Sequence, residues 1–231
     1  MNVGSFKTYL VTPEQLQVFL HPQPLESWLT ESERSRLCSL RSPARRTDWL
    51  AGRLAAKQLL RDYSLQTQNI LLKLNAIEIY NDASDVPAFN IHLDSSIVDV
   101  NISIAHSHGH GICALSETTK LGYVGIDIEK IRPLSEGVLR KFLSEEEMAQ
   151  LCHRPISDLS ENAIAYWTIK EAALKSLRTD QSLSLRDLRV FFKESGKSSV
   201  FVANRKVQVR YCKWKDFWIA IALCPVASEK I

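Results

Sequence analysis

The sequence lacks the features that mark a membrane or secreted protein. Its 231 residues contain no apolar run near the ~20 residues that a bilayer-spanning helix needs. The longest apolar run, residues 218–224, has the length of a buried strand. The N-terminus has no basic stretch followed by a long apolar one, so we expect no targeting segment. The five cysteines form no C-x-x-C pair, which argues against a disulfide framework or zinc ribbon and favours the reducing cytoplasm.

Charge of one sign is also scarce. The chain has 29 Lys and Arg against 26 Asp and Glu, a formal net charge of +3. This is too small for the whole molecule to be a nucleic-acid binder, so neither nucleic acid nor a membrane is an expected partner. Hydrophobic residues make up 45% and charged residues 24%, the balance of a soluble globular protein.

The first half of the sequence predicts a strand, then helices, then further strands. Residues 6–11 alternate like a strand. Thr12 and Thr30 each begin a capping box, and Ser42-Pro43 opens a longer helix that reaches about Tyr63. Strands are predicted over 70–80, 97–104 and 111–116, with no repeat or low-complexity tract between them.

The second half repeats this order. A strand over 123–129 precedes a capping box at Ser144, a helix over 161–177 and hairpin strands from Leu188 onward. The two halves therefore predict an α+β fold of two pseudo-symmetric lobes, residues 1–118 and 119–231, each an antiparallel sheet packed against helices.

Two acids stand on the first strand of the second half. Asp127 and Glu129 are two positions apart, so they face the same side of an otherwise apolar strand. Two like charges held together favour a bound cation, and carboxylate oxygens suit Mg²⁺. The alternative is an exposed edge-strand face that carries two acids.

The helix over 161–177 carries a second pattern. Trp167, Glu171 and Lys175 are four residues apart and share one face. Taken alone, they favour a core tryptophan beside an intrahelical ion pair. The long first-half helix likewise aligns Arg46, Arg53 and Lys57 on one stripe, which suits a phosphorylated ligand or, equally, a solvated basic face.

Alternating histidines form a further candidate. His106, His108 and His110 resemble the start of a metallo-hydrolase zinc motif, but that motif needs an aspartate at position 110 and the sequence has none nearby. A polar turn with one functional histidine is the better interpretation, and a zinc hydrolase is kept as the rival.

In this order and spacing, the motifs resemble those of the Sfp-type phosphopantetheinyl transferases. Residues 125–129 (GIDIE) and 167–175 (WTIKEAALK) match that family's two signatures. Weaker likenesses lie in residues 142–147, 101–107 and 49–57. The resemblance implies two lobes with coenzyme A in the cleft between them.

The resemblance also implies chemical roles in the second half. Asp127, Glu129 and Glu171 would bind Mg²⁺, with Asp127 and Glu171 needed for catalysis. Glu171 would take the proton from the serine of an apo acyl or peptidyl carrier protein. Lys175 would contact coenzyme A and stabilise or protonate the departing 3′,5′-ADP.

Phosphate contacts are implied for further basic residues. Lys170 and His106 would contact phosphates, and Arg46, Arg53 and Lys57 are candidates for the 3′-phosphate, with Arg53 the strongest. The family's G-K-P segment, which meets the adenine, is replaced here by Asp85-Val86-Pro87, and Ala105 replaces a serine.

The resemblance predicts a holo-carrier-protein synthase that acts as a cytoplasmic monomer, because two lobes in one chain supply the whole site. A binding module that holds coenzyme A or a carrier without turnover is the second rival. The complete set of acids and Lys175 argues against it.

Overall fold

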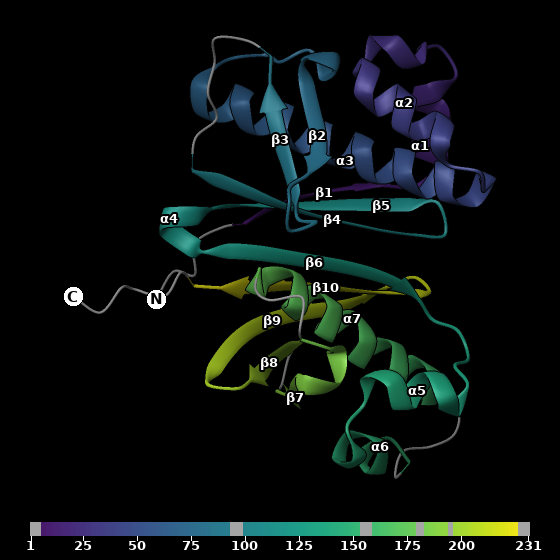
Figure 1. The fold of residues 1–231 in the computed structure, drawn as a ribbon, viewed down its shortest axis with the longest axis vertical. Coiled ribbons are helices and arrows are strands. Elements are labelled where there is room, and N and C mark those ends of the chain that lie inside the picture. Colours follow the sequence, from purple (N-terminus) through teal and green to yellow (C-terminus); the bar gives the residue numbers. More distant parts are fainter. Residues whose placement is uncertain (1–5, 93–98, 153–158, 179–182, 194–195, 226–231) are drawn as a thin grey trace. The chain divides into compact units, whose positions relative to one another are not determined.

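The computed structural model describes residues 6–92, 99–152, 159–178, 183–193 and 196–225. The chain divides into two compact units, Met1–Lys120 and Leu121–Ile231. Each unit has its own core of buried apolar side chains and combines antiparallel strands with helices (Figure 1). The predicted α+β class is confirmed, whereas the assignment of residues 1–118 and 119–231 as two transferase lobes stays a prediction.

The first unit holds a three-stranded antiparallel sheet, in the order β1-β5-β4, and a separate hairpin, β2-β3. Its elements in chain order are β1 (Lys7–Val11), α1 (Pro13–Leu20), α2 (Glu31–Ser39), α3 (Pro43–Gln68), β2 (Ile77–Asn81), β3 (Pro87–Ile91), β4 (Val100–Ser107), β5 (His110–Glu117) and α4 (Thr118–Leu121).

The predicted starts of the first three helices are confirmed. The side chain of Thr12 accepts a hydrogen bond from the Gln15 amide, and Thr30 does the same for Glu33, so both boxes satisfy amides that the helix leaves free. Ser42 caps α3. Helix α3 runs to Gln68, past the predicted end, and stops at Asn69, whose φ of 56° is left-handed.

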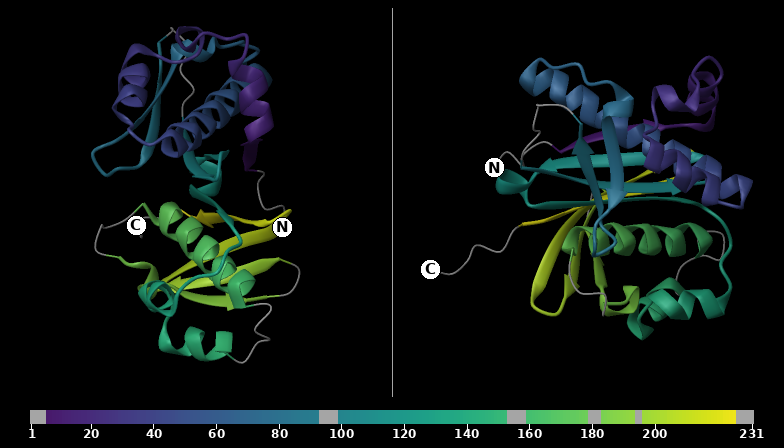
Figure 2. Two further views of the ribbon diagram at one scale, coloured as in Figure 1. Left: turned by 90° about the vertical axis from the view of Figure 1, so that its right-hand side faces the viewer. Right: turned by 45° about the horizontal axis from the view of Figure 1, so that its top comes forward.

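Helix α3 lies along the three-stranded sheet of the first unit (Figures 1 and 2). The contact is close because Gly111 on β5 has no side chain. A Cβ at that position would lie 2.1 Å from the carbonyl carbon of Ala51. Ala51, Ala55 and Leu59 of α3 are accordingly buried.

The second unit is one five-stranded antiparallel sheet in the order β6-β10-β9-β8-β7. Its elements are β6 (Tyr123–Lys130), α5 (Glu136–Phe142), α6 (Glu145–Cys152), α7 (Leu159–Leu177), β7 (Arg189–Phe192), β8 (Lys197–Val202), β9 (Arg205–Trp214) and β10 (Phe217–Cys224). The last strand, β10, therefore lies inside the sheet, between β6 and β9.

Helix α7 crosses this sheet over β6 and β10 (Figure 2). Gly125 of β6 permits the approach, because a Cβ there would lie 2.0 Å from the Ala172 carbonyl oxygen. Ala172 and Ala173 are fully buried at the same contact. The GIDIE segment therefore places its acids directly beside α7.

Three parts of the fold differ from the sequence prediction. The strand predicted over 70–80 begins only at Ile77, because Leu74–Ala76 form a short 3₁₀ turn and Leu71 is exposed. Strand β3 was not predicted; it begins at Pro87 and pairs with β2 alone. Helix α5 was missed because it has seven residues and no side-chain cap on its first turn.

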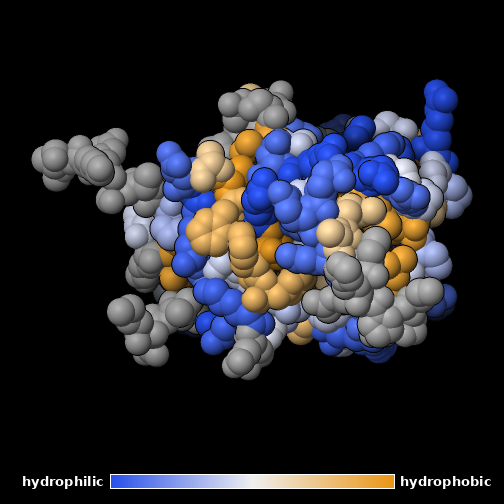
Figure 3. All heavy atoms as spheres, turned by 90° about the horizontal axis from the view of Figure 1, so that it is seen from below, coloured by the Kyte–Doolittle hydropathy of each residue, from blue (hydrophilic) through white to orange (hydrophobic). Residues whose placement is uncertain are grey.

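The outer edge of the second sheet exposes aromatic side chains. Phe191 of β7 and Phe201 of β8 meet edge to face with ring centroids 5.3 Å apart, and Lys206 lies over the Phe201 ring. Apolar side chains gather beside hydrophilic ones on the face that Figure 3 views from below. In the part of the chain that the structure describes, no helix is long and apolar enough to cross a membrane.

Candidate functional site

The acid pattern on β6 becomes a compact ion group in the second unit. Asp127 is buried, and its Oδ1 accepts a hydrogen bond from Lys175 Nζ at 2.7 Å. Lys175 also donates to the Ile126 carbonyl oxygen at 3.2 Å. Asp127 Oδ2 is buried and has no hydrogen-bond partner. An ionised oxygen buried in this way favours a cation close by.

Glu171 belongs to the same group. It lies on α7 one turn before Lys175. Burial raises the pKa of Glu171; Lys175 lowers it and Asp127 raises it. Burial acts to lower the pKa of Lys175, but Asp127, Glu171 and Glu129 outweigh that effect and raise it. The structure thus brings the three predicted acids within electrostatic reach of Lys175.

The residue types of this group fit a hard divalent cation, which prefers carboxylate oxygens. The unpartnered Asp127 Oδ2 offers a first ligand atom. Among the described residues, no three His, Cys, Asp or Glu side chains are already gathered closely enough to hold a metal. Binding would therefore require these side chains to move together.

Lys170 is enclosed in the second unit, whereas the resemblance implied that it contacts a phosphate. It is fully buried, with its Nζ 2.6 Å from Glu147 Oε2 and 2.7 Å from the Phe142 carbonyl oxygen. Burial lowers its pKa and Glu147 raises it. An ammonium group enclosed in this way has no path to a ligand, so this structure does not support the predicted phosphate contact of Lys170.

Trp167 also has a structural position. Its ring packs edge to face on Phe142 with centroids 4.9 Å apart. The tryptophan of the signature thus helps to join α5 to α7, as its interpretation as a core residue predicted.

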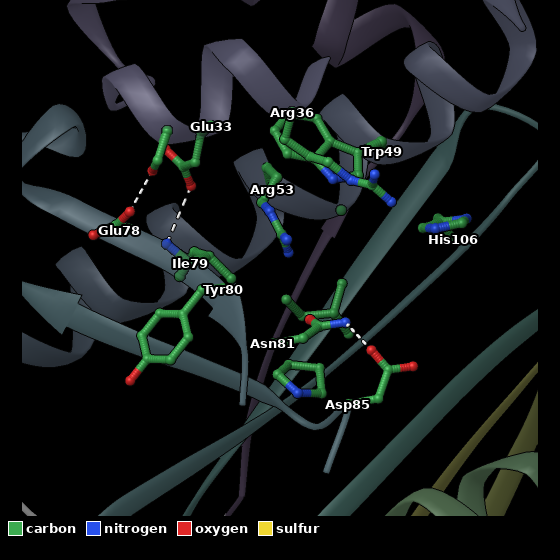
Figure 4. Close-up of a pocket in the computed structure, with 14 residues that line it drawn as sticks. Glu33, Arg36, Trp49, Arg53, Glu78, Ile79, Tyr80, Asn81, Asp85 and His106 are labelled. Carbon is green, nitrogen blue, oxygen red and sulfur yellow. Dashed lines mark hydrogen bonds between the residues drawn. The ribbon is translucent and has the colours of Figure 1, made fainter. Parts of the chain in front are cut away.

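The first unit contains a cavity of ≈ 550 Å³ that opens beside α3 (Figure 4). It is lined by residues from α2, α3, β2, β3 and β4. These include two arginines and one histidine: Arg36, Arg53 and His106. The guanidinium of Arg53 points into the cavity and lies 4.9 Å from the centre of the Trp49 ring.

Arg53 is held there with spare hydrogen-bonding capacity. Its Nε is buried and has no partner. Burial lowers the pKa of Arg53, Glu33 raises it and Arg36 lowers it, yet a guanidinium stays charged at neutral pH. A buried, partly unsatisfied cation at a cavity wall is a suitable anchor for an anion.

The other two cations of the predicted stripe do not line the cavity. Arg46 is exposed near the start of α3. Lys57 is fully buried, with its Nζ 2.6 Å from Glu33 Oε2, and it also donates to the carbonyl oxygens of Leu74 and Ile77. Only Arg53 of the three keeps the position expected of a phosphate contact.

Among the polar residues of the cavity that sequence reasoning missed are Arg36, Glu78, Tyr80 and Asn81. They come from α2 and β2, and no spacing along the chain relates them to Arg53. The Asp85-Val86-Pro87 departure also lies here. Asp85 has a left-handed φ of 60°, and its Oδ1 accepts a hydrogen bond from Asn81 Nδ2 at 2.7 Å.

The histidine segment forms the turn between β4 and β5. His106 faces the cavity, whereas Ser107 Oγ lies 3.0 Å from His108 Nδ1 within the turn. His108 is left-handed, with φ of 51°, and its carbonyl oxygen lies 3.2 Å from His110 Nδ1. This arrangement is a polar turn with one histidine at the cavity, and the ligand contact of His106 stays a prediction.

Sequence comparison identifies a family model and several relatives. Residues 123–222 match the model of the 4′-phosphopantetheinyl transferase superfamily. The chain is 28% identical over 102 residues to the 4′-phosphopantetheinyl transferase Sfp of Bacillus subtilis (strain 168), a match that covers 44% of each protein. It is 26% identical over 156 residues to the 4′-phosphopantetheinyl transferase HetI of Nostoc sp. (strain PCC 7120), covering 67% of this chain and 61% of HetI. The chain thus spans less than half the length of the first of these relatives.

Solved structures give a weaker likeness. A holo-(acyl-carrier-protein) synthase from Bacillus anthracis, in complex with CoA (3′,5′-ADP), is 26% identical, with a TM-score of 0.38 and coverage of 49% of this chain and 93% of that one. A holo-[acyl-carrier-protein] synthase from Helicobacter pylori, in complex with coenzyme A, is 19% identical, with a TM-score of 0.37 and coverage of 44% and 98%.

Proposed function

Because residues 123–222 carry the sequence of the 4′-phosphopantetheinyl transferase superfamily, we propose that this protein transfers the phosphopantetheine arm of coenzyme A to a serine of an apo carrier protein. The observation that carries the proposal is the ion group of the second unit. Asp127 is buried there with one oxygen on Lys175 and the other without a hydrogen-bond partner, beside Glu171.

The proposed metal ligands are Asp127, Glu129 and Glu171, and the proposed metal is Mg²⁺. When bound, Mg²⁺ would neutralise charge on the pyrophosphate of coenzyme A. The carboxylates would hold it against the apolar surroundings of β6. Glu171, whose pKa burial raises, is suited to accept a proton because its basicity exceeds that of an exposed carboxylate.

In the proposed reaction, the serine oxygen of the carrier bonds to the phosphorus that bears the pantetheine arm. The bond from that phosphorus to the bridging oxygen of the pyrophosphate breaks, and 3′,5′-ADP leaves with the electron pair. The serine proton passes to Glu171, directly or through one water. Lys175 compensates the charge that grows on the departing phosphate.

The cavity of the first unit is proposed to bind the 3′-phosphate end of coenzyme A. Arg53 has an unpartnered Nε, and Arg36 and His106 add donors at the same wall. Together they replace the predicted stripe, since Lys57 is enclosed and Arg46 lies outside the cavity. A charge-assisted contact of this kind contributes roughly 1.5–3 kcal/mol.

We further propose that the enzyme acts as a cytoplasmic monomer. Cys38, Cys113, Cys212 and Cys224 are free thiols, which suits a reducing compartment. Mass spectrometry of a panel of apo carrier proteins, incubated with coenzyme A and Mg²⁺, would identify the carrier. Light scattering under the same conditions would give the oligomeric state of the active form.

The test of the ion group is substitution of Asp127 and Glu171. Asp127→Ala and Glu171→Ala should each lower transfer by about a hundredfold or more, because several kcal/mol of charge stabilisation are lost. Asp62→Asn, at a half-exposed position on α3, is the control and should transfer normally. Near-normal turnover by either variant at saturating Mg²⁺ would contradict the proposal.

A binding module without turnover makes a different prediction. Its wild type would bind coenzyme A in a calorimeter but leave every carrier in the panel unmodified. A zinc hydrolase would contain zinc as purified, which metal analysis would detect.

A further inference from the structure

Lys175 has a second feature that its role at the leaving phosphate does not require. Its ammonium lies directly on the carboxylate proposed to bind metal, 2.7 Å from Asp127 Oδ1. Three acids act on it together: Asp127, Glu171 and Glu129. The positive charge that the acid group needs is therefore already present within the chain.

We propose that Lys175 is an internal stand-in for the metal ion: its ammonium lies on Asp127 Oδ1 where the acid group needs a cation, and a divalent cation that takes both oxygens of Asp127 displaces it. The inference deepens the proposed function and rests on its metal site. It explains how a buried Asp127 can lie near two half-buried glutamates, since an unpaired buried carboxylate would be costly.

The contacts of Lys175 suit a group that can leave. Its side chain is 32% exposed and donates hydrogen bonds to the Asp127 carboxylate and to the Ile126 carbonyl oxygen. Lys170, five residues earlier on the same helix, is 0% exposed and bonded to Glu147 and to the Phe142 carbonyl oxygen. The long flexible stem of a lysine with a path to solvent can swing away, whereas an enclosed lysine cannot.

The exchange makes a definite prediction about affinity. A metal that must displace Lys175 loses part of its binding free energy to breaking the Lys175–Asp127 ion pair. Removing the ammonium removes this competition and leaves the carboxylates without a cation. Metal should then bind more tightly, and the metal-free protein should be less stable.

The experiment measures Mn²⁺ alone, in the absence of coenzyme A, by isothermal calorimetry on the full chain. Lys175→Met should bind Mn²⁺ about tenfold more tightly than the wild type, and Lys175→Arg, which keeps the cation, should bind like the wild type. The thermal midpoint of Lys175→Met should fall in EDTA and recover in Mn²⁺ by more than that of the wild type.

The matched control is Lys130→Met. Lys130 ends β6, carries the same charge and pairs with Asp216 rather than with Asp127. If both variants tighten Mn²⁺ binding equally, the effect is the long-range field of a lost charge and the inference is overturned.

Other outcomes are also decisive. Unchanged or weaker Mn²⁺ binding by Lys175→Met overturns the inference, even if wild-type transfer to a carrier proceeds normally and the proposed function stands. Absence of Mn²⁺ binding in every variant also overturns it. The proposed function fails separately, if the wild type transfers nothing to any carrier in the panel.

Discussion

Both units contain the same kind of buried ion pair, in which a lysine of the long helix binds a glutamate that also accepts a hydrogen bond from a strand amide. The units differ in the side chains that the long helix places beside this ion pair. In the first unit, Lys57 of α3 binds Glu33 Oε2, while Glu33 Oε1 accepts the Ile79 amide of β2 at 3.1 Å. In the second, Lys170 of α7 binds Glu147 Oε2, and Glu147 Oε1 accepts the Val190 amide of β7 at 3.0 Å.

The likeness extends to the origin of each glutamate. Glu33 and Glu147 both close a capping box, accepting hydrogen bonds from the amides of Thr30 and Ser144 at 2.9 Å. One carboxylate therefore joins the start of a helix, the middle of the long helix and a strand. Because this arrangement of atoms occurs in both units, it supports the pseudo-symmetry that the sequence halves predicted.

The two units differ in the side chains beside the buried ion pair. Helix α3 directs Arg53 into a cavity, whereas α7 places Glu171 and Lys175 beside Asp127. The buried ion pair fixes the long helix in each unit. The side chains at neighbouring helix positions determine whether the unit attracts an anion or a cation. This comparison separates residues needed for folding from those proposed to bind ligands.

The largest expected effect on stability comes from removing the lysine of the buried ion pair in either unit. Lys57→Met or Lys170→Met leaves a buried glutamate without its cation, which should cost about 3–5 kcal/mol of stability. Urea unfolding monitored by circular dichroism measures the loss. Lys213→Met, which removes an exposed ion pair with Glu161, should cost less than about 1 kcal/mol and serves as the control.

A second pair of variants tests whether the buried charge is the cause. Lys57→Met/Glu33→Gln and Lys170→Met/Glu147→Gln should each recover part of the lost stability, because a neutral amide replaces the unpaired carboxylate. A double variant no more stable than its single parent would show that packing, and not charge, dominates that unit.

The next largest effect concerns the cavity of the first unit. Arg53→Ala should raise the KM for coenzyme A by roughly ten- to a hundredfold, the loss of one charge-assisted contact. The KM for dephospho-coenzyme A, which lacks the 3′-phosphate, should barely change. Steady-state kinetics with both substrates provides the measurement, and Arg46→Ala, outside the cavity, is the matched control.

Two other results would assign Arg53 differently. An equal loss for both substrates would place its contact on the fold or on the pyrophosphate. No change for either substrate would leave the arginine as a solvated side chain and remove the cavity from the proposed binding site.

The smallest expected effect compares the two caps. Thr30→Ala and Ser144→Ala should each lower stability by about 1 kcal/mol, because each removes the hydroxyl that accepts a hydrogen bond from the amide of the third residue of its helix. If the capped glutamate and its ion pair are equivalent in the two units, the two losses of stability should agree within the error of thermal unfolding. A loss in one unit alone would limit the likeness to geometry.

Local sequence patterns predicted much of this molecule. The boxes at Thr12, Thr30 and Ser144 depend on residues three positions apart, and their hydrogen bonds are as expected. The i, i+2 spacing of Asp127 and Glu129 likewise predicted a carboxylate pair at a buried strand. Such features depend only on residues that are close together in the sequence.

Other features depend on tertiary packing that spacing cannot supply. Helical periodicity aligned Arg46, Arg53 and Lys57, yet their environments are exposed, cavity-lining and fully buried. The spacing predicted that the three side chains point to the same side of α3. It could not predict the position of α2, whose Glu33 forms an ion pair with Lys57. Arg36 of the same helix was missed for the same reason.

The interior place of β10 in the second sheet sets the time at which the ion group can form during synthesis. Asp127 lies opposite Ala220, and the whole length of β6 pairs with β10. A ribosome therefore releases the acids, α7 and the hairpin strands well before the strand that completes the sheet around Asp127. Pairing over so long a stretch of chain is slow compared with local hairpins. Until β10 inserts, the nascent chain carries an open gap between β6 and β9, a state in which chaperone binding or mispairing competes with folding.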